Sequence, residues 1–433
     1  MFKERRGRLL EALGSGAAVF AAGREQRRNG DVDHEFRQES TFWYLTGFEE
    51  PDAVAVLRPG HEEPYVLFVR PHDPEQAVWV GPRVGVDGAV ERYGASAAYP
   101  VEELAERLPR LLDGVETLHF ALGSDERLGR LLGELVTRRR DGAQRGAAPI
   151  ARVADPTPLV DALRLLKGPE ELDALRRAIA VTGAGIEAAM RATQPGLHEY
   201  EVQAAMEAEF RRLGSPRNGF PSIVASGPGA CTLHYTTNRR RIEAGELLLL
   251  DVGAEWDYYS ADVTRTFPVD GRLTPEQRAV YDIVLEAQRR GIEAAGPGVP
   301  FHAVHDAALR ALVEGLVELE VIAGPVDEAI EQRTFRPYYM HSTSHWLGLD
   351  VHDVGAYRQG EASTVLESGM VLTVEPGLYF NPDAGPVPER LRHIGVRIED
   401  DVAITAEGHE VLSVAIPKDA EAFEAIVGRP RER

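Results

Sequence analysis

The feature that most limits what this chain can fold into is a pattern that occurs twice in its C-terminal part. In each copy a long helix is expected, a Pro-Gly pair ends it, a second helix follows, and strands come next. The expected helices cover residues 168–193 and 198–213 in the first copy, and residues 274–295 and 302–319 in the second. This repetition predicts two similar halves related by an internal pseudo-two-fold axis.

An acidic residue closes a corresponding apolar strand in each half. Asp251 stands six residues after Gly245, and Glu375 stands six residues after Gly369. Two more carboxylates, Asp262 and Glu399, also lie on or at the ends of apolar strands. Acidic residues are disfavoured in strands, and several of them gathered together repel one another. A pair of divalent cations would remove this repulsion, so the four carboxylates predict a metal centre.

A histidine-rich stretch adds nitrogen to this set. Residues 341–353 read H-S-T-S-H-W-L-G-L-D-V-H-D, which by itself could be a solvated loop or a buried strand. His341 and His345 are four residues apart, but the glutamate of an H-E-x-x-H zinc motif is missing between them. With His345 as one nitrogen among oxygens, the site suits Mn²⁺, with Co²⁺, Fe²⁺ or Zn²⁺ as alternatives.

The N-terminal part predicts a separate α/β layer. Strands are expected at residues 17–22, 53–57, 65–69 and 117–122, and helices at 3–13, 104–112 and 126–140. Residues 141–158 are rich in Gly, Ala and Pro with little periodicity. We therefore expect two domains, residues 1–155 and residues 156–433.

Composition excludes several classes of partner. The net charge of −21 argues against nucleic acid or an anionic membrane as the main partner. No apolar run approaches the roughly 20 residues that a membrane span needs, and no secretion signal is expected. The single cysteine, Cys231, cannot form an internal disulfide, which fits a reducing, cytoplasmic location.

The acids and the histidine together resemble a known family. Asp251, Asp262, His345, Glu375 and Glu399, in this order, resemble the dinuclear metal ligands of the pita-bread metallopeptidases. That family includes methionine aminopeptidase, prolidase and aminopeptidase P. Four segments are most similar to aminopeptidase P: F-R-Q-E-S-T-F-W-Y-L-T-G-F-E-E-P at 36–51, H-Y-T-T-N from 234, the histidine stretch from 341, and V-E-P-G-L-Y around 375.

The resemblance implies an α/β (α+β) chain with a creatinase-like N-terminal α/β domain and a C-terminal pita-bread catalytic domain. It implies hydrolysis of the N-terminal Xaa-Pro bond of peptides by a hydroxide that bridges two divalent ions, commonly Mn²⁺. It also implies a homodimer or homotetramer.

The resemblance assigns roles to individual residues. Glu375 would be both a metal ligand and a proton acceptor, and His234 would stabilise the developing oxyanion. His352 would contact the scissile carbonyl and the proline side of the substrate. The remaining residues would line or orient the pocket, namely His341, Arg397 and Tyr379, whereas Asp350 and Asp353 would be structural.

Two alternatives remain at this stage. A prolidase has the same fold and ions but cleaves only dipeptides. A non-catalytic or metal-free use of the fold should have lost some ligands, whereas all five are present here. Without the resemblance, His234 would be read as a turn histidine and Arg397 as an ordinary arginine on a strand face.

Overall fold

The computed structural model describes residues 1–429, which form two compact units. The first unit is Met1–Leu163, and the second begins at Arg164. The division falls within helix α7 (Thr157–Leu165), just after the boundary near residue 155 that composition suggests. Within the described residues, no helix combines the length and the apolar character that crossing a membrane requires.

The first unit is built on a six-stranded sheet in the order β6-β5-β4-β1-β7-β8. Strand β4 is antiparallel to both of its neighbours, and the other neighbouring pairs are parallel. The strands are β1 (Ala17–Ala21), β4 (Val54–Leu57), β5 (Tyr65–Val69), β6 (Ala97–Pro100), β7 (Thr117–His119) and β8 (Arg152–Ala154). The predicted α/β layer is confirmed.

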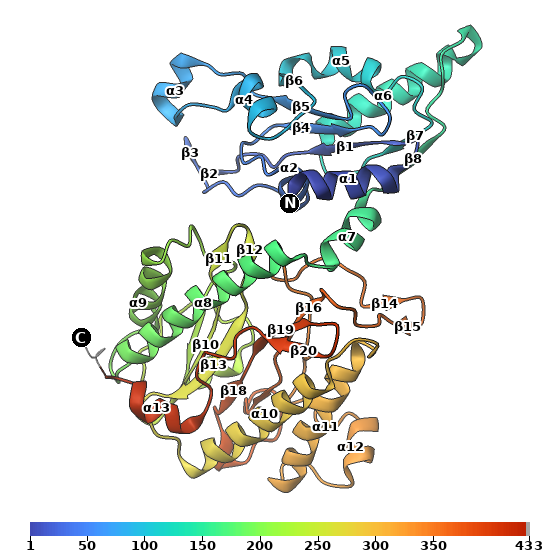
Figure 1. Cartoon of the computed structure of the whole chain (residues 1–433). Helices are drawn as coiled ribbons and strands as arrows, with labels where there is room; N and C mark the ends of the chain where they lie inside the picture. Colours follow the sequence, from blue (N-terminus) through green and yellow to red (C-terminus); the bar gives the residue numbers. More distant parts are fainter. Residues whose placement is uncertain (430–433) are drawn as a thin grey trace. The chain divides into compact units, whose positions relative to one another are not determined.

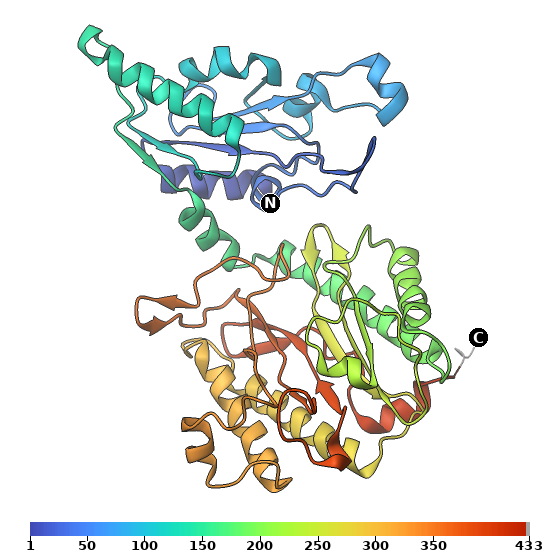
Figure 2. The same ribbon diagram turned by 180° about the vertical axis from the view of Figure 1, so that it is seen from behind.

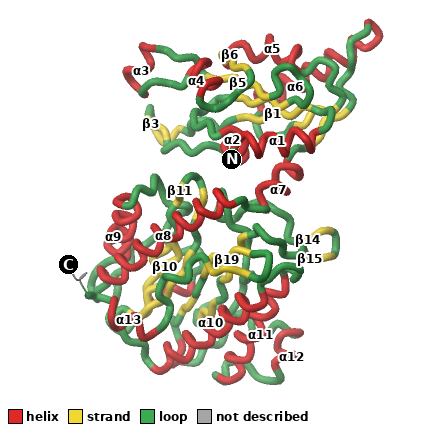
Figure 3. The backbone as a smooth tube through the Cα atoms, viewed as in Figure 1, coloured by secondary structure: helices red, strands yellow, loops and turns green. Residues whose placement is uncertain are grey.

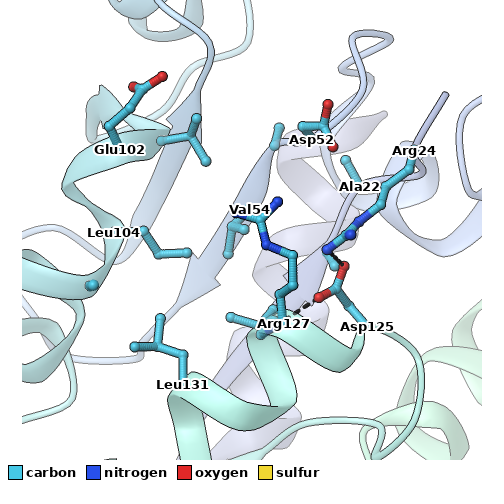
Figure 4. Close-up of a pocket in the computed structure, with 14 residues that line it drawn as sticks. Ala22, Arg24, Asp52, Val54, Glu102, Leu104, Asp125, Arg127 and Leu131 are labelled. Carbon is cyan, nitrogen blue, oxygen red and sulfur yellow. Dashed lines mark hydrogen bonds and ion pairs between the residues drawn. The ribbon is translucent and has the colours of Figure 1, made fainter.

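Helices cover both faces of this sheet (Figure 1). Helices α5 (Leu104–Leu111) and α6 (Glu126–Gly142) lie on one face, and α1 (Phe2–Leu13) and α2 (Ser40–Thr46) lie on the other. Two short helices, α3 (Pro74–Val80) and α4 (Gly85–Glu91), complete the unit. A cavity of about 360 Å³ opens between the starts of α5 and α6, and the Arg24–Asp125 ion pair borders it (Figure 4).

The second unit contains the predicted pairs of helices. They are α8 (Pro169–Ala192) with α9 (Glu199–Arg212), and α10 (Pro275–Ala294) with α11 (His302–Glu318). Helix α10 begins where the sequence predicts, because Thr274 and Gln277 cap each other and Pro275 supplies a helical φ. The repeated helix pattern is therefore confirmed.

The strands of the two halves meet in the middle of this unit (Figures 2 and 3). The first half contributes a sheet in the order β13-β10-β9, and the second contributes β16-β19-β20 and β17-β18. The Glu399 amide donates to the carbonyl of Thr264 at 3.1 Å, which joins the halves. The strands are β9 (Ile223–Ser226), β10 (Leu247–Val252), β13 (Val263–Pro268), β16 (Val371–Val374), β17 (Gly377–Tyr379), β18 (Gly395–Arg397), β19 (Asp400–Ile404) and β20 (His409–Val411).

The remaining elements of the two units are short. They are β2 (Arg27–Asn29), β3 (Val32–Asp33), β11 (Glu255–Trp256), β12 (Tyr259–Ser260), β14 (Arg358–Gln359), β15 (Ala362–Ser363), α12 (Val326–Glu331) and α13 (Ala420–Ile426). Buried apolar side chains of α8 to α11 pack against β10, β13 and β18 to form the main core of the second unit.

Candidate active site

Carboxylates and a histidine from both halves converge where the two sets of strands meet. Asp262, His345 and Glu399 each offer one ligand atom, and these three atoms lie within 4.8 Å of one another. The Nε2 atom of His345 lies 3.3 Å from an oxygen of Asp262 and 3.6 Å from an oxygen of Glu375. The juxtaposition expected from the duplicated pattern is therefore present.

The strands explain why these residues arrive at one place. Asp251 lies near the end of β10, opposite Thr264 of β13, and Asp262 directly precedes β13. Glu375 directly follows β16, and its amide donates to the carbonyl of Thr343 at 2.8 Å. Glu399 lies between β18 and β19. The ends of strands from two halves therefore bring together acids that are distant in sequence.

The carboxylates destabilise one another's charged forms. Burial raises the pKa of Asp262 well above its ordinary value, and the neighbouring Asp251, Asp401 and Glu375 raise it further. Burial also raises the pKa of Glu399, with Asp262 and Glu375 adding to the effect. The pKa of Glu375 rises to about 7 through burial, although His345 and Arg397 oppose the shift. This accumulation of buried negative charge favours cations.

The available ligand atoms fit divalent cations. The Oδ1 atom of Asp251 is buried and has no hydrogen-bond partner among residues 1–429. The Nδ1 atom of His345 lies 3.0 Å from the carbonyl of Trp346, to which it can donate. That bond places the proton on Nδ1 and leaves the lone pair of Nε2 directed at the acids, as a metal ligand requires.

Arg397 connects several members of the site. Its guanidinium donates to Asp251 at 2.6 Å, to the Tyr379 hydroxyl at 2.9 Å and to the Thr264 hydroxyl at 3.2 Å. The Tyr379 hydroxyl is in turn 2.8 Å from the Nε2 atom of His341. Burial and the charge of Arg397 lower the pKa of His341 to about 3, so this imidazole is neutral near pH 7. Arg397 thus positions one carboxylate and, through Tyr379, one histidine.

A cavity of about 560 Å³ opens above these residues. His234, His341 and His352 line it, together with aromatic walls from Phe301 and Tyr357. The ring of His352 stands edge-on to that of His345, with centroids 4.5 Å apart. The cavity is lined by Leu233, His234, Asp251, Phe301, His341, Ser342, Ser344, His345, His352, Tyr357, Glu375 and Arg397.

Three sequence-predicted residues lie deeper than this lining. Asp262 and Glu399 are buried and do not line the cavity, and the fully buried Tyr379 contacts His341 and Arg397. All ten predicted site residues, metal and catalytic, therefore occupy one connected region. Tyr379 contacts the region through its hydroxyl group and is not part of the cavity lining.

Sequence reasoning missed two contributors, Asp401 and Thr264. One oxygen of Asp401 accepts from the Asp262 amide at 3.2 Å, and the other is buried without a partner among the described residues. The Thr264 hydroxyl donates to Glu399 at 2.7 Å. The run Glu399-Asp400-Asp401 on a strand carried a signal for Asp401. Asp400 points elsewhere, to Arg265 at 2.7 Å.

Comparison with known proteins relates this geometry to a family. Residues 173–406 match metallopeptidase family M24, and residues 2–119 match the N-terminal domain of aminopeptidase P. The Xaa-Pro aminopeptidase of Escherichia coli is 42% identical, with 100% of this chain and 98% of that protein covered. The Xaa-Pro aminopeptidase of Haemophilus influenzae is 40% identical, with 96% and 95% covered.

Solved structures agree with the sequence relatives. The aminopeptidase PepP of Pseudomonas aeruginosa superposes with a TM-score of 0.96 at 42% identity, covering 98% of this chain and 97% of that chain. A zinc-substituted Escherichia coli aminopeptidase P in complex with product gives a TM-score of 0.95 at 40% identity, covering 99% and 98%. The similarity extends over nearly the whole chain and supports dependence on a divalent metal. The chain therefore belongs to metallopeptidase family M24, within the aminopeptidase P group.

Proposed function

We propose that this protein removes the N-terminal residue from peptides whose second residue is proline. The observation that carries the proposal is the convergence of Asp262, His345 and Glu399, with Asp251 and Glu375 beside them, under a cavity lined by histidines. The names of the relatives, Xaa-Pro aminopeptidases of two bacteria at 40–42% identity, support the same substrate class.

Two divalent cations would be held by five side chains: Asp251, Asp262, His345, Glu375 and Glu399. The ligand set is mostly carboxylate oxygen with one imidazole nitrogen, which favours Mn²⁺, whereas Co²⁺, Fe²⁺ or Zn²⁺ could replace it. When bound, such a pair lowers the pKa of a water molecule toward neutrality and polarises the scissile carbonyl.

The protein's own groups complete the reaction. Glu375, which lines the cavity, would accept the proton of the nucleophilic water and pass it to the leaving proline nitrogen. His234, which lines the cavity, would donate to the oxyanion that develops on the carbonyl oxygen. His352 and His341 would contact the substrate on its proline side, and Arg397 would keep Asp251 and Tyr379 in place.

Selection of proline follows from its chemistry. Its ring fixes φ, and an Xaa-Pro bond has no N–H to satisfy, so an apolar wall can accept it without an unpaired donor. Phe301 and Tyr357 provide aromatic surface in the same cavity as the histidines. A peptide with another residue in the second position would bring its backbone N–H against this apolar wall, and that N–H would lose its hydrogen bond to water.

Cleavage of Arg-Pro-Pro compared with Gly-Pro tests the proposal against the prolidase alternative. We expect release of free arginine from the tripeptide, with the dipeptide cleaved slowly or not at all. Cleavage of the dipeptide alone would establish a prolidase and contradict the proposal. The relatives favour the aminopeptidase, since the names given above are Xaa-Pro aminopeptidases.

We further propose a cytoplasmic homodimer or homotetramer. Helix α3 exposes Val78, Trp79 and Val80, whose exposed fractions are 83%, 84% and 66%, and contiguous apolar surface of this kind favours subunit contact. The only cysteine, Cys231, is buried, which fits a reducing compartment. Light scattering of the wild type and of Trp79→Ser tests the assembly, and a monomeric wild type would contradict it.

A further inference from the structure

A second cavity, of about 490 Å³, lies beside the one that holds the candidate active site. His341 and Ser342 line both cavities, so the two cavities are adjacent. The second cavity is bounded by the first half of α11 and by the segment that follows α12, two helices that pack together (Figure 1). It therefore lies within the second unit, next to the candidate active site.

The wall of this cavity carries two arginines whose side chains have no partner among the described residues. Neither the Arg333 nor the Arg336 side chain makes a hydrogen bond or an ion pair with any residue from 1 to 429. Neighbouring arginines behave differently: Arg310 of α11 pairs with Asp327 at 2.7 Å, and Arg290 of α10 pairs with Glu314 at 2.6 Å. In a chain with a net charge of −21, two unpaired cations beside the site form a local positive surface.

The other residues that line this cavity do not neutralise the charges of Arg333 and Arg336. The single carboxylate in the wall is Asp306, which faces His302 at 3.7 Å. His305 is mostly buried and lies 2.9 Å from the Thr343 hydroxyl. Burial lowers the pKa of His305, so it adds no positive charge near pH 7. The two guanidinium groups therefore dominate the charge of the wall.

The backbone conformation at Arg333 supports a role for its side chain. Arg333 closes α12 in the left-handed conformation, with φ of 56°, where glycine is normally preferred. An arginine costs about 1 kcal/mol more than glycine in this conformation. At this local cost in conformational energy, the sequence places a cation in the wall of the cavity.

The chemistry of the wall indicates what it would bind. Guanidinium groups bind carboxylates through paired hydrogen bonds, and apolar side chains of Leu309, Phe335 and Met340 lie beside them. Because His341 and Ser342 border both cavities, a peptide that continues past His341 from the first cavity would reach this wall. We propose that Arg333 and Arg336 form an accessory subsite for a carboxylate located downstream of proline in the substrate, an inference that rests on the proposed function.

Four peptides and two variants test this subsite. The peptides are Ala-Pro-Ala-Ala with a free C-terminus, its C-terminal amide, and amides with glutamate as the third or the fourth residue. The test variant is Arg333→Gln/Arg336→Gln. The matched control, Arg289→Gln/Arg310→Gln, removes two exposed charges from α10 and α11 that do not line the cavity.

We expect the wild type to cleave carboxylate-bearing peptides with a kcat/KM about 3- to 10-fold above that of the neutral amide, as an exposed charge-assisted contact allows. The Arg333→Gln/Arg336→Gln variant should lose this preference through KM, with kcat and cleavage of the neutral amide within about twofold of wild type. The control variant should keep the preference. Preference for the free C-terminus or for the glutamate amides would identify which carboxylate is bound.

Two results would overturn the inference: no charge preference in the wild type, or an equal loss for charged and neutral peptides in the test variant. If no Xaa-Pro peptide is cleaved by the metal-loaded wild type, the proposed function itself fails. Cleavage without charge preference therefore refutes only the subsite.

Discussion

Arg397 is the residue to which we assign the orientation of Asp251 and Tyr379. It is buried, and its guanidinium reaches Asp251, Tyr379 and Thr264 within 3.2 Å. Lysine would keep the charge but can form only one of these contacts well. We expect Arg397→Lys to lose about 10- to 100-fold in metal affinity or kcat, as loss of a group that orients ligands usually does. Metal titration of activity measures this, with the exposed Arg392→Lys as control; unchanged affinity and turnover would remove Arg397 from this role.

Glu375 is the carboxylate that we assign to proton transfer as well as to metal binding. In Glu375→Gln the side chain keeps its size and one oxygen, so part of the bound metal should remain. Turnover should nevertheless fall about 10³-fold, because the amide cannot accept a proton. Metal content and kcat measured on the same sample separate the two effects. The exposed Glu367→Gln is the control, and near-normal turnover in Glu375→Gln would exclude the proton-accepting role.

The residues that sequence analysis found differ from those it missed in a recognisable way. Asp251 and Glu375 each end an apolar strand at the same distance from a glycine, so a local pattern marks them. Asp401 joins the site through the amide of Asp262, a residue 139 positions away, and that contact exists only after the halves meet. Local patterns therefore predicted the candidate ligands and the meeting of the two halves, whereas an individual contact across the halves, such as that of Asp401, could not be predicted.

The end of α7 and the segment that follows it anchor the loop that carries His352. The Nζ atom of Lys167 and a guanidinium nitrogen of Arg164 lie 2.9 Å and 2.6 Å from the two oxygens of buried Asp353. Gly348 permits this approach, since a Cβ there would lie 2.1 Å from Asp353. Asp353→Asn would leave two buried cations undercompensated and should lower the free energy of unfolding by about 3–5 kcal/mol.

Denaturant unfolding measures this loss, and Asp350→Asn is the matched control. Asp350 also accepts from Arg164, but its side chain is 40% exposed, so the control should change stability by about 1 kcal/mol or less. Equal effects of the two substitutions would show that burial of the Asp353 pair does not matter.

The same ion pairs predict a dependence of stability on pH. Burial opposes the charged form of Asp353, but Lys167 and Arg164 outweigh it and lower the pKa below its ordinary value. A lowered folded-state pKa stabilises the protein above the unfolded-state pKa of about 3.9, and this stabilisation is lost as the pH falls below it. The stability gap between wild type and Asp353→Asn should therefore be constant from about pH 7 to 5 and shrink below about pH 4. A gap that widens in acid would contradict the assignment.

At the level of elements, the sequence predicted those with strong local signals. Helices with Pro and acids in the first turn, such as α8 and α10, begin close to their predicted starts. Helix α2 was not predicted, because Phe42-Trp43-Tyr44 is typical of strands and the helix depends on Glu39 accepting from the amides of Thr41 and Phe42. The hairpin strands of two or three residues were not predicted, because they are too short to show an alternation of apolar and polar residues.

At the scale of the whole molecule, the candidate active site lies where the two similar halves of the second unit meet. The first half supplies Asp251 and Asp262, and the second supplies His345, Glu375 and Glu399, so neither half alone could form the site. The duplication predicted from the sequence explains this arrangement. Aminopeptidase function requires that the junction be occupied by divalent ions, which makes metal dependence the central claim.

Product analysis with and without metal tests that claim most directly. Protein treated with a chelator and dialysed is incubated with Ala-Pro-Ala-Ala or Ala-Ala-Ala-Ala, with and without added Mn²⁺, and the products are identified by mass spectrometry. We predict no cleavage without metal, and with Mn²⁺ the release of one alanine from the proline peptide only. Equal cleavage by the metal-free protein, or equal cleavage of the two peptides, would contradict the account.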